Sequence, residues 1–287
     1  MKKQIKILVT GGSGSLGRNI IKILLSLGFK NIVSISRDEN LIKDAEMEIG
    51  LSPVRFKLGD ITDQQLIPRL MKDIDVVFHA AALKHVSLAE QNPREAHRIN
   101  VMGLLNLLDN SASIKRFIHV SSDKAIGVMN CYGGTKLLGE YLVRESNSLY
   151  PGNKYIIVRC PNLFWSRGSV LDIWDRQLAL YNKIKMTDPQ MTRYFVTLPE
   201  VANFIVHIGL DVNTKPETIY YPLEITRKFM LGDLAQAFLE VYGKKDTKID
   251  VTGSLPGEKK HEDYIADVKL TSKAILKKLL KQAVKKS

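Results

Sequence analysis

The sequence of 287 residues contains little cysteine and no long hydrophobic run. Two cysteines, Cys131 and Cys160, are too few for a disulfide scaffold, and no cysteine or histidine spacing predicts a metal site. No apolar run approaches the roughly 20 residues that span a bilayer, and the first run, at residues 5–9, is too short for a signal peptide. We therefore expect a cytoplasmic protein with no bound metal and no transmembrane segment.

Charge is unbalanced, but the imbalance is concentrated near the C-terminal end. The chain has 42 Lys+Arg against 30 Asp+Glu, which gives a formal net charge of +12. Residues 268–287 contain seven lysines and no acid, so subtracting them from twelve leaves +5 for residues 1–267. Such a total favours a nucleic-acid or anionic-membrane partner at first sight, whereas the uneven distribution leaves the body only mildly basic.

The lysine-rich tail has the pattern of an amphipathic helix over residues 272–286, with an apolar face opposite the lysines. Packing of that face on the body or on a neighbouring subunit is the favoured interpretation. An anchor on a membrane surface is the alternative. Nucleic acid is not expected as a partner, because no aromatic residues are interleaved with the lysines.

Short apolar runs alternate with helical patterns through the first half of the chain. Strand-like runs occupy residues 5–9, 31–35, 54–58, 75–79, 116–120 and 155–158. Helical patterns occupy residues 16–27, 93–109 and 132–149. This alternation predicts an α/β fold with a Rossmann-type, doubly wound parallel sheet. After Pro161 it becomes irregular, so we expect a first unit over residues 1–160 and a smaller lobe over residues 161–287, with some segments returning to the first unit.

A glycine-rich turn with the spacing GxxGxxG follows the first strand and precedes an amphipathic helix. Glycine allows the backbone to approach a pyrophosphate closely, and the helix N-terminus adds N–H donors and a positive dipole end. A purely structural turn is the alternative, but this position in the chain favours a dinucleotide cofactor. The residues of this candidate cofactor turn are Gly11, Ser13, Gly14, Ser15, Leu16 and Gly17.

The end of the second strand should lie beside the adenosine ribose of that cofactor. Ser36 and Arg37 stand there, and an arginine accommodates a 2′-phosphate, so NADP is favoured. Asp38 follows directly and keeps NAD possible. After the third strand, Asp60 and Ile61 fit an adenine contact, although Asp60 suits the cap of the next helix equally well.

Candidate catalytic residues follow the fifth strand. Tyr132 and Lys136 have the spacing YxxxK, which places a phenol and an ammonium one turn apart on a helix. The lysine can lower the pKa of the phenol and hold the cofactor, so that the tyrosine exchanges a proton with a substrate hydroxyl. Ser122, ten residues upstream of Tyr132, can hydrogen-bond the same hydroxyl, and Ser121 lies beside it. This pattern resembles the extended short-chain dehydrogenase/reductases that modify nucleotide sugars.

An acid and a lysine, Asp123 and Lys124, follow Ser122 directly. A dehydratase needs such a pair, because a base must remove the proton from carbon 5 of the sugar while an acid protonates the hydroxyl that leaves carbon 6. A solvated loop pair is the alternative interpretation. Nucleotide-sugar epimerases are not expected to carry an acid and a lysine at this place.

The whole pattern resembles the bacterial UDP-N-acetylglucosamine 4,6-dehydratases of polysaccharide and flagellin-sugar pathways, in their short form. The resemblance extends from residue 5 to about residue 264 in separate blocks. These blocks read TGGSGSLGRN, SRDEN, HAAALKHVSLAEQNPREAHRIN, SSDKAIGVMNCYGGTK, SRGSV, TDPQMTR and PGEKKHE. It implies a homo-oligomeric lyase that recycles a bound NADP or NAD during dehydration of a UDP-N-acetylhexosamine.

The resemblance also implies roles for individual residues. Acid and base roles fall on Asp123 and Lys124, with Lys124 the favoured base. Further cofactor contacts fall on Ala80, Ala81, Ala82, Lys84, Asn100, Ser121, Tyr132 and Lys136. Substrate contacts fall on Lys84, His85, Asn162, Arg167, Ser169, Val170, Met191, Arg193 and Glu258. Asn100 has a second interpretation, in which it packs the helix that follows Pro93.

Departures from the resembling proteins cluster around the sugar pocket. Cys131 stands where they often carry leucine, and Trp165 stands where they carry glycine. Tyr132 favours inversion at carbon 5, because the long, retaining relatives tend to carry methionine there. A UDP-hexosamine 4-epimerase and a non-catalytic NAD(P)-binding sensor remain the alternative functions.

Overall fold

The short apolar runs of the first half form a parallel sheet, as their alternation with helices predicts. The computed structural model describes residues 4–50, 53–254 and 256–283. Within these residues a seven-stranded sheet has the order β10-β6-β5-β4-β1-β2-β3, and every pairing is parallel. Its strands are β1 (Ile7–Thr10), β2 (Ile32–Ser36), β3 (Val54–Leu58), β4 (Val76–His79), β5 (Arg116–Ser122), β6 (Lys154–Cys160) and β10 (Ile219–Tyr220).

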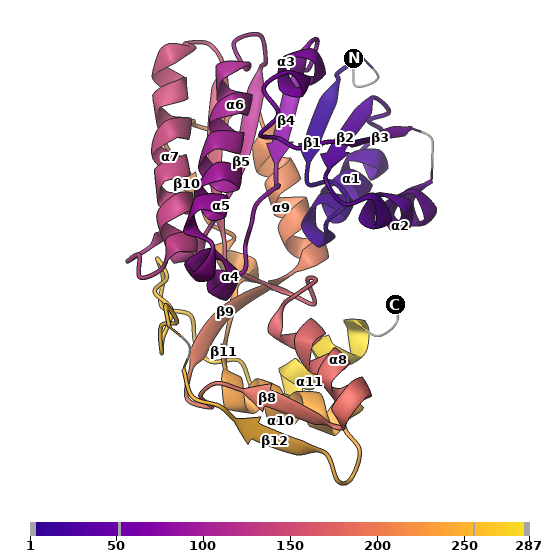
Figure 1. Cartoon of the computed structure of the whole chain (residues 1–287), viewed down its shortest axis with the longest axis vertical. Coiled ribbons are helices and arrows are strands. Elements are labelled where there is room, and N and C mark those ends of the chain that lie inside the picture. Colours follow the sequence, from indigo (N-terminus) through magenta and orange to yellow (C-terminus); the bar gives the residue numbers. More distant parts are fainter. Residues whose placement is uncertain (1–3, 51–52, 255, 284–287) are drawn as a thin grey trace.

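Helices cover both faces of this sheet, so its strands are almost uniformly apolar. One face carries α1 (Ser15–Ser26), α2 (Glu39–Ile49) and α9 (Leu198–Leu210). The other carries α3 (Leu66–Met71), α6 (Gly103–Asp109) and α7 (Cys131–Leu149). The chain order reverses between β1 and β4, and in such sheets ligands bind beyond the carboxyl ends of the strands at this point. Figure 1 shows the sheet and these helices in the upper part of the molecule.

The segment at residues 93–109 differs from the single regular helix that its pattern predicts. It consists of α5 (Pro93–His97), one π-helical turn (Arg98–Met102) and α6. A short helix α4 (Val86–Gln91) precedes it. The wide turn contains Asn100, whose side chain bonds the backbone of Leu83 twice and the hydroxyl of Thr135 once. Asn100 of the π-helical turn therefore joins the loop after β4 to α7. Such turns often lie at functional sites.

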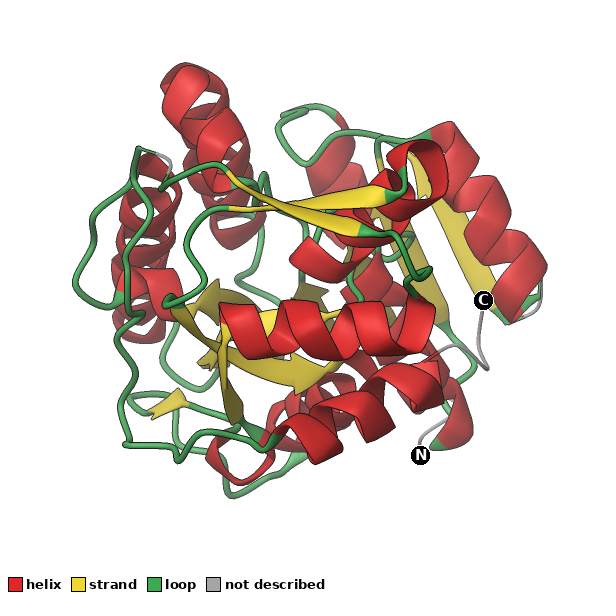
Figure 2. Ribbon diagram, turned by 90° about the horizontal axis from the view of Figure 1, so that it is seen from below, coloured by secondary structure: helices red, strands yellow, loops and turns green. Residues whose placement is uncertain are grey.

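Two small sheets and three helices make up most of the second half of the chain. In the described residues, β7 (Asn162–Phe164), β9 (Thr192–Thr197) and β11 (Arg227–Met230) form one sheet, and β8 (Lys183–Met186) pairs with β12 (Lys248–Val251). The helices are α8 (Val170–Tyr181), α10 (Leu231–Tyr242) and α11 (Lys273–Ala283). They share a core with the small sheets, and this lobe lies below the central sheet in Figure 1. Figure 2, seen from that end, shows helices around the strands.

The division of the chain between the two parts is not sequential. Helix α9 packs against α1, and β10 extends the central sheet beside β6, although both follow residue 160. None of the helices in the described ranges is long and apolar enough to cross a membrane.

The C-terminal helix α11 packs its apolar side against α10. Leu276 and Leu280 are fully buried in the core of the small lobe, and the Tyr242 hydroxyl donates to the Leu280 carbonyl at 2.6 Å. Lys273 and Lys277 form ion pairs with Glu240 of α10. Of the predicted helix at residues 272–286, residues 284–286 lie outside the described residues.

Candidate active site

A cleft of about 2100 Å³ opens at the carboxyl ends of the central strands and extends to the small lobe. Most of the residues singled out from the sequence line it. They are Gly11, Ser13, Gly14, Ser15, Leu16, Gly17, Ser36, Arg37, Ile61, Ala80, Ala81, Ala82, Lys84, His85, Ser121, Ser122, Asp123, Lys124, Tyr132, Lys136, Asn162, Arg167, Ser169, Val170, Arg193 and Glu258. Asp60, Asn100 and Met191 are not part of its lining.

The glycine turn between β1 and α1 has no room for side chains. Gly11 has a φ of +68°, and a Cβ there would lie 2.9 Å from the backbone of Ala81. A Cβ on Gly17 would lie 2.2 Å from the Gly11 carbonyl oxygen. The turn therefore presents bare backbone and the N-terminus of α1 to the cleft, an arrangement that fits a pyrophosphate.

The cleft is polar beyond β2, where the ribose of a dinucleotide would lie. The Ser36 hydroxyl accepts a hydrogen bond from the Ser13 N–H at 3.2 Å. Arg37 is half-exposed and lies 3.6 Å from Asp60, a loose ion pair. Asp60 accepts from the N–H of Thr62, so it closes a local turn rather than the cap of α3. Asp38, by contrast, is the N-cap of α2.

The loop after β4 contacts the loop between β7 and α8. Lys84 donates to the Ser166 hydroxyl at 3.2 Å. The His85 ring lies where a Cβ on Gly168 would be, 2.1 Å from its nearest atom, so only glycine fits at this contact. Burial lowers the pKa of the Lys84 ammonium. The Lys84 and His85 side chains therefore already have structural partners in the loop between β7 and α8.

That loop also reaches the glycine turn. The Arg167 N–H donates to the Ser15 hydroxyl at 3.0 Å, and the Arg167 guanidinium lies 3.9 Å from Asp38. Ser169 is the N-cap of α8, which begins at Val170. The predicted substrate residues of this block thus lie at the cofactor end of the cleft as well as near the small lobe.

Trp165, the departure just before this loop, has a φ of +58°, which favours glycine. Its ring packs against Phe238 and Tyr242 of α10. Aromatic packing therefore holds the left-handed backbone that glycine would otherwise adopt without strain.

Tyr132 lies in the first turn of α7 and is buried beside Ser122. Burial raises the pKa of its phenol, and the hydrogen bond with Ser122 and the charge of Lys124 oppose this rise without cancelling it. The sequence predicts that Lys136 lowers the pKa of this phenol. In the structure the opposing charge comes from Lys124 instead, and the pKa of the phenol stays above its ordinary value.

Lys136 extends under the end of β5 and donates to the Val120 carbonyl at 2.5 Å. Burial lowers the pKa of its ammonium to about 8, with the charge of Glu140 opposing. Glu140 in turn accepts from Ser121 and forms a bidentate pair with Arg159. Ser121 therefore serves a buried network behind the cleft as well as lining it.

Asp123 and Lys124 form a short 3₁₀ turn directly after β5, which aims both side chains into the cleft. The Asp123 Oδ1 atom accepts from the Ser122 hydroxyl at 2.9 Å and from Lys124 Nζ at 3.1 Å. Its Oδ2 atom is buried and has no hydrogen-bond partner among the described residues. Burial raises the pKa of this carboxyl to about 6, which favours its protonated form in mildly acidic conditions.

Lys124 has two further partners. Its Nζ atom donates to Asn162 Oδ1 at 3.1 Å and lies 2.9 Å from Glu262 Oε1. Burial alone would lower the pKa of the ammonium, but the carboxylates of Asp123 and Glu262 outweigh it, and the pKa is raised. Sequence reasoning did not single out Glu262, although it is the last residue of the block PGEKKHE, in which only Glu258 was given a role.

The small lobe delivers the remaining predicted residues from β7, β9 and the segment after β12. Asn162 bonds Lys124, Glu262 and the Tyr194 carbonyl. Met191 is fully buried, and its sulfur accepts from Arg193 at 3.1 Å, so it supports Arg193 rather than lining the cleft.

The chain is similar to known proteins over most of its length. A family model described as "Polysaccharide biosynthesis protein" matches residues 7–283. The chain belongs to this family. Among its relatives, an uncharacterized membrane protein of Methanocaldococcus jannaschii is 35% identical over 92% of the chain and 81% of its own length. A Campylobacter jejuni protein named UDP-N-acetylglucosamine 4,6-dehydratase (inverting) is 34% identical over 91% of the chain and 77% of its own.

Some relatives are longer than this chain, and solved structures share its fold. The chain spans about half of two longer relatives, 48% and 47% of their lengths. The crystal structure of DesIV, a dTDP-glucose 4,6-dehydratase from Streptomyces venezuelae, matches with a TM-score of 0.84 over 98% of each chain. At 17% identity this match shows the fold alone, a parallel sheet covered by helices on both faces with a smaller second lobe.

Proposed function

We propose that this protein is a UDP-N-acetylglucosamine 4,6-dehydratase that uses NAD(P). The observation that carries the proposal is the Asp123–Lys124 pair. The buried Asp123 and the half-buried Lys124 lie 3.1 Å apart in the cleft of a dinucleotide-binding fold, which Tyr132 also lines. The relative in Campylobacter jejuni carries this activity in its name, and it is 34% identical to this chain over 269 aligned residues.

The glycine turn of α1 would hold the pyrophosphate of the dinucleotide, and Tyr132 and Lys136 would face its nicotinamide end. When bound, the dinucleotide supplies the acceptor and donor of the hydride at carbons 4 and 6 of the sugar. Tyr132 exchanges the proton of the 4-hydroxyl, and Ser122 positions the phenol. The resulting ketone at carbon 4 makes the proton on carbon 5 acidic.

The elimination of water then falls to the acid and the lysine. Lys124 first passes its proton to the Asp123 carboxylate, 3.1 Å away, because its own raised pKa keeps it charged at rest. Neutral Lys124 then takes the proton from carbon 5, and protonated Asp123 gives its proton to the hydroxyl that leaves carbon 6 as water. The unpartnered Oδ2 atom of Asp123 is available for that hydroxyl. Lys124 Nζ lies 3.1 Å from Asp123 Oδ1, so the proton gained from carbon 5 can pass to Asp123 and reset the pair.

NADP is the cofactor form that we favour. Arg37 is half-exposed and held only by loose ion pairs, 3.6 Å from Asp60 and 3.7 Å from Glu95, so its guanidinium is free to turn toward a 2′-phosphate. The Asp38 carboxylate, which would suit the 2′-hydroxyl of NAD, already caps α2. Inversion at carbon 5 is the stereochemistry that we propose, on the basis of Tyr132 and of the name of the Campylobacter jejuni relative.

A direct assay tests the function. Purified protein is incubated with UDP-N-acetylglucosamine, and mass spectrometry should detect loss of one water. Asp123→Asn should lower the turnover by about 10²- to 10⁴-fold, as expected for loss of a general acid, while it keeps NADPH binding. A product of unchanged mass would identify an epimerase instead. Bound cofactor with no product from any UDP-hexose would favour the non-catalytic sensor. Proton NMR in deuterated water then distinguishes inversion from retention at carbon 5.

A further inference from the structure

Glu262 lies at the centre of the buried polar contacts around Lys124. Its side chain is 8% exposed, against 19% for Lys124 and 0% for Asp123. One carboxylate oxygen lies 2.9 Å from Lys124 Nζ, and the other accepts from Asn162 Nδ2 at 2.8 Å. Arg193 Nε lies 3.6 Å from the first oxygen. A carboxylate with so many partners in a buried site is expected to stay ionised.

Hydrogen bonds of the neighbouring backbone also hold the segment that carries Glu262 in place. The N–H of Thr192 on β9 donates to the Lys260 carbonyl, and the Thr192 hydroxyl bonds the His261 ring at 3.0 Å. The same segment is bonded to the N-terminus of α7, because the side chain of Asn130 donates to the Gly257 carbonyl at 3.0 Å. The small lobe thus inserts Glu262 against residues of the central sheet, and it does so from a segment that is far away in sequence.

We infer that Glu262 is a positioning residue for the elimination of water, which holds Lys124 in place and stabilises its positive charge as the proton leaves carbon 5. This inference rests on the proposed function. Without Glu262, the charge that Lys124 acquires would face only Asp123, which has just donated its own proton. With Glu262, Lys124 acquires its charge against a carboxylate that takes no part in the transfer.

The same carboxylate affects Asp123. Glu262 adds to the effect of burial in raising the pKa of the Asp123 carboxyl, so it favours the protonated form that the departing hydroxyl requires. Burial opposes ionisation of Glu262 itself, but Lys124 and Arg193 outweigh it and lower the pKa of Glu262. Further titratable groups act on Asp123, Lys124 or Glu262 from several elements: Tyr132 on α7, Cys160 on β6, Arg193 on β9 and Tyr264 after β12.

The protonation states predict how activity depends on pH. The active pair holds one proton in total, shared between Asp123 and Lys124, and its apparent pKa values belong to the pair. A second proton converts Lys124 to an ammonium beside a protonated Asp123, which leaves no base. Activity should therefore fall as the pH drops through about 6, the pKa of Asp123. Removal of a neighbouring negative charge lowers that pKa and shifts this acid limb to lower pH.

The experiment measures kcat/KM for dehydration against pH. Glu262→Gln should lower kcat by at least tenfold and move the acid limb down by roughly one pH unit, with little change in KM. Glu262→Asp, which keeps the charge, should leave the limb in place and recover part of kcat. Glu217→Gln, at an exposed carboxyl distant from the cleft lining, is the matched control and should behave as wild type.

The outcomes separate this inference from the function on which it rests. If the wild type forms no dehydrated product, the proposed function fails. If the wild type does so and Glu262→Gln leaves the acid limb unmoved, the role of Glu262 is overturned. Should Glu262→Gln not fold, Glu262→Asp decides, since its shorter side chain holds Lys124 less closely and must lower kcat, and a kcat equal to that of the wild type again overturns the role.

Discussion

At the scale of single residues, the site depends on charges that are buried together. Asp123 and Lys124 are adjacent in sequence, yet a 3₁₀ turn directs both into one cleft. Burial raises the pKa of the acid to about 6, and the two carboxylates around Lys124 raise the pKa of the ammonium. An acid that can hold a proton and a lysine that gains from accepting one are what the elimination of water requires.

Cofactor choice also depends on one residue. Arg37→Ala should weaken binding of NADPH by about tenfold to a hundredfold, because a charge-assisted hydrogen bond contributes roughly 1.5–3 kcal/mol. It should leave NADH binding nearly unchanged, since NADH has no 2′-phosphate. Fluorescence titration of both cofactors measures the difference, with Arg55→Ala at an exposed position of β3 as the control. An equal loss for both cofactors, or none for either, would contradict the preference for NADP.

The sequence predicts the residues of this site better than their contacts. The pair at Asp123 and Lys124 and the YxxxK spacing lie within 14 residues of chain, so local pattern finds them. Glu262 reaches Lys124 only because the segment after β12 returns to the end of β5, 138 positions along the chain. Local spacing carries no information on such a return, and one carboxylate within a charged block has no distinguishing pattern of its own.

At the scale of elements, the sequence predicts those features that require a fixed spacing of apolar residues or of glycines. The parallel sheet follows from its apolar runs, and the glycine turn from its spacing. The π-helical turn before α6 was not predicted, because apolar periodicity does not reveal one inserted residue. The role of Asn100 in joining that turn to the loop after β4 and to α7 depends on this insertion.

Alanine at two glycine positions, one in the glycine turn and one in α7, should change the free energy of unfolding in opposite directions. Gly17→Ala places a Cβ 2.2 Å from the Gly11 carbonyl and should lower the free energy of unfolding by roughly 1–3 kcal/mol. It should also weaken NADPH binding. Gly134→Ala, in α7, meets only the Val128 side chain at 3.8 Å and should raise the free energy of unfolding by roughly 0.5–1 kcal/mol. Urea unfolding and cofactor titration measure both, and a Gly17→Ala variant as stable as wild type would show that the turn has more freedom than its geometry allows.

At the scale of the whole molecule, the active site exists only where the two parts of the chain meet. Asp123, Lys124 and Tyr132 come from the end of β5 and from α7, whereas Asn162, Arg193 and Glu262 come from the small lobe. The boundary at residue 160 and a homo-oligomeric state remain predictions.

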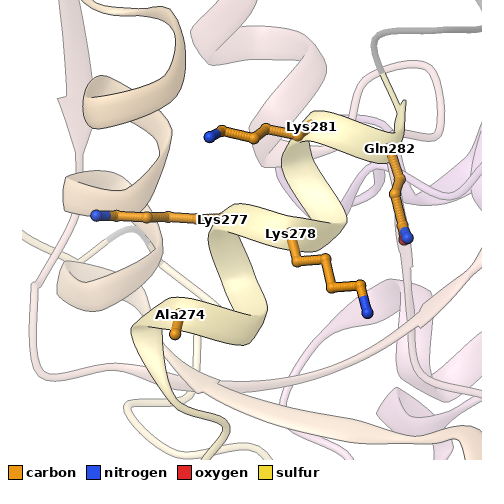
Figure 3. Close-up of a pocket in the computed structure, with 5 residues that line it drawn as sticks. All are labelled: Ala274, Lys277, Lys278, Lys281 and Gln282. Atoms are coloured by element: carbon orange, nitrogen blue, oxygen red, sulfur yellow. The ribbon is translucent and has the colours of Figure 1, made fainter.

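Part of the net charge of +12 belongs to a helix that is packed on the small lobe. Helix α11, which carries four of the lysines, is packed on α10 through its apolar face. A membrane anchor of the kind considered from the sequence needs that face free for lipid. Figure 3 shows Lys277 and Lys281 extending to one side of the helix and Lys278 to the other, around a pocket of about 460 Å³. The lysines therefore lie around a helix whose three leucines, Leu276, Leu279 and Leu280, pack in or against the core of the small lobe.

This packing predicts which substitutions in the tail matter. Leu280→Ala should lower the free energy of unfolding by about 2–5 kcal/mol, because Leu280 is fully buried among the core residues of the small lobe. Lys278→Ala, at an exposed position of the same helix, should change it by less than about 0.5 kcal/mol. Chemical unfolding of both variants measures the contrast. If the leucine variant is as stable as the lysine variant, α11 does not belong to the core, and its apolar face becomes available to a membrane or to a second subunit.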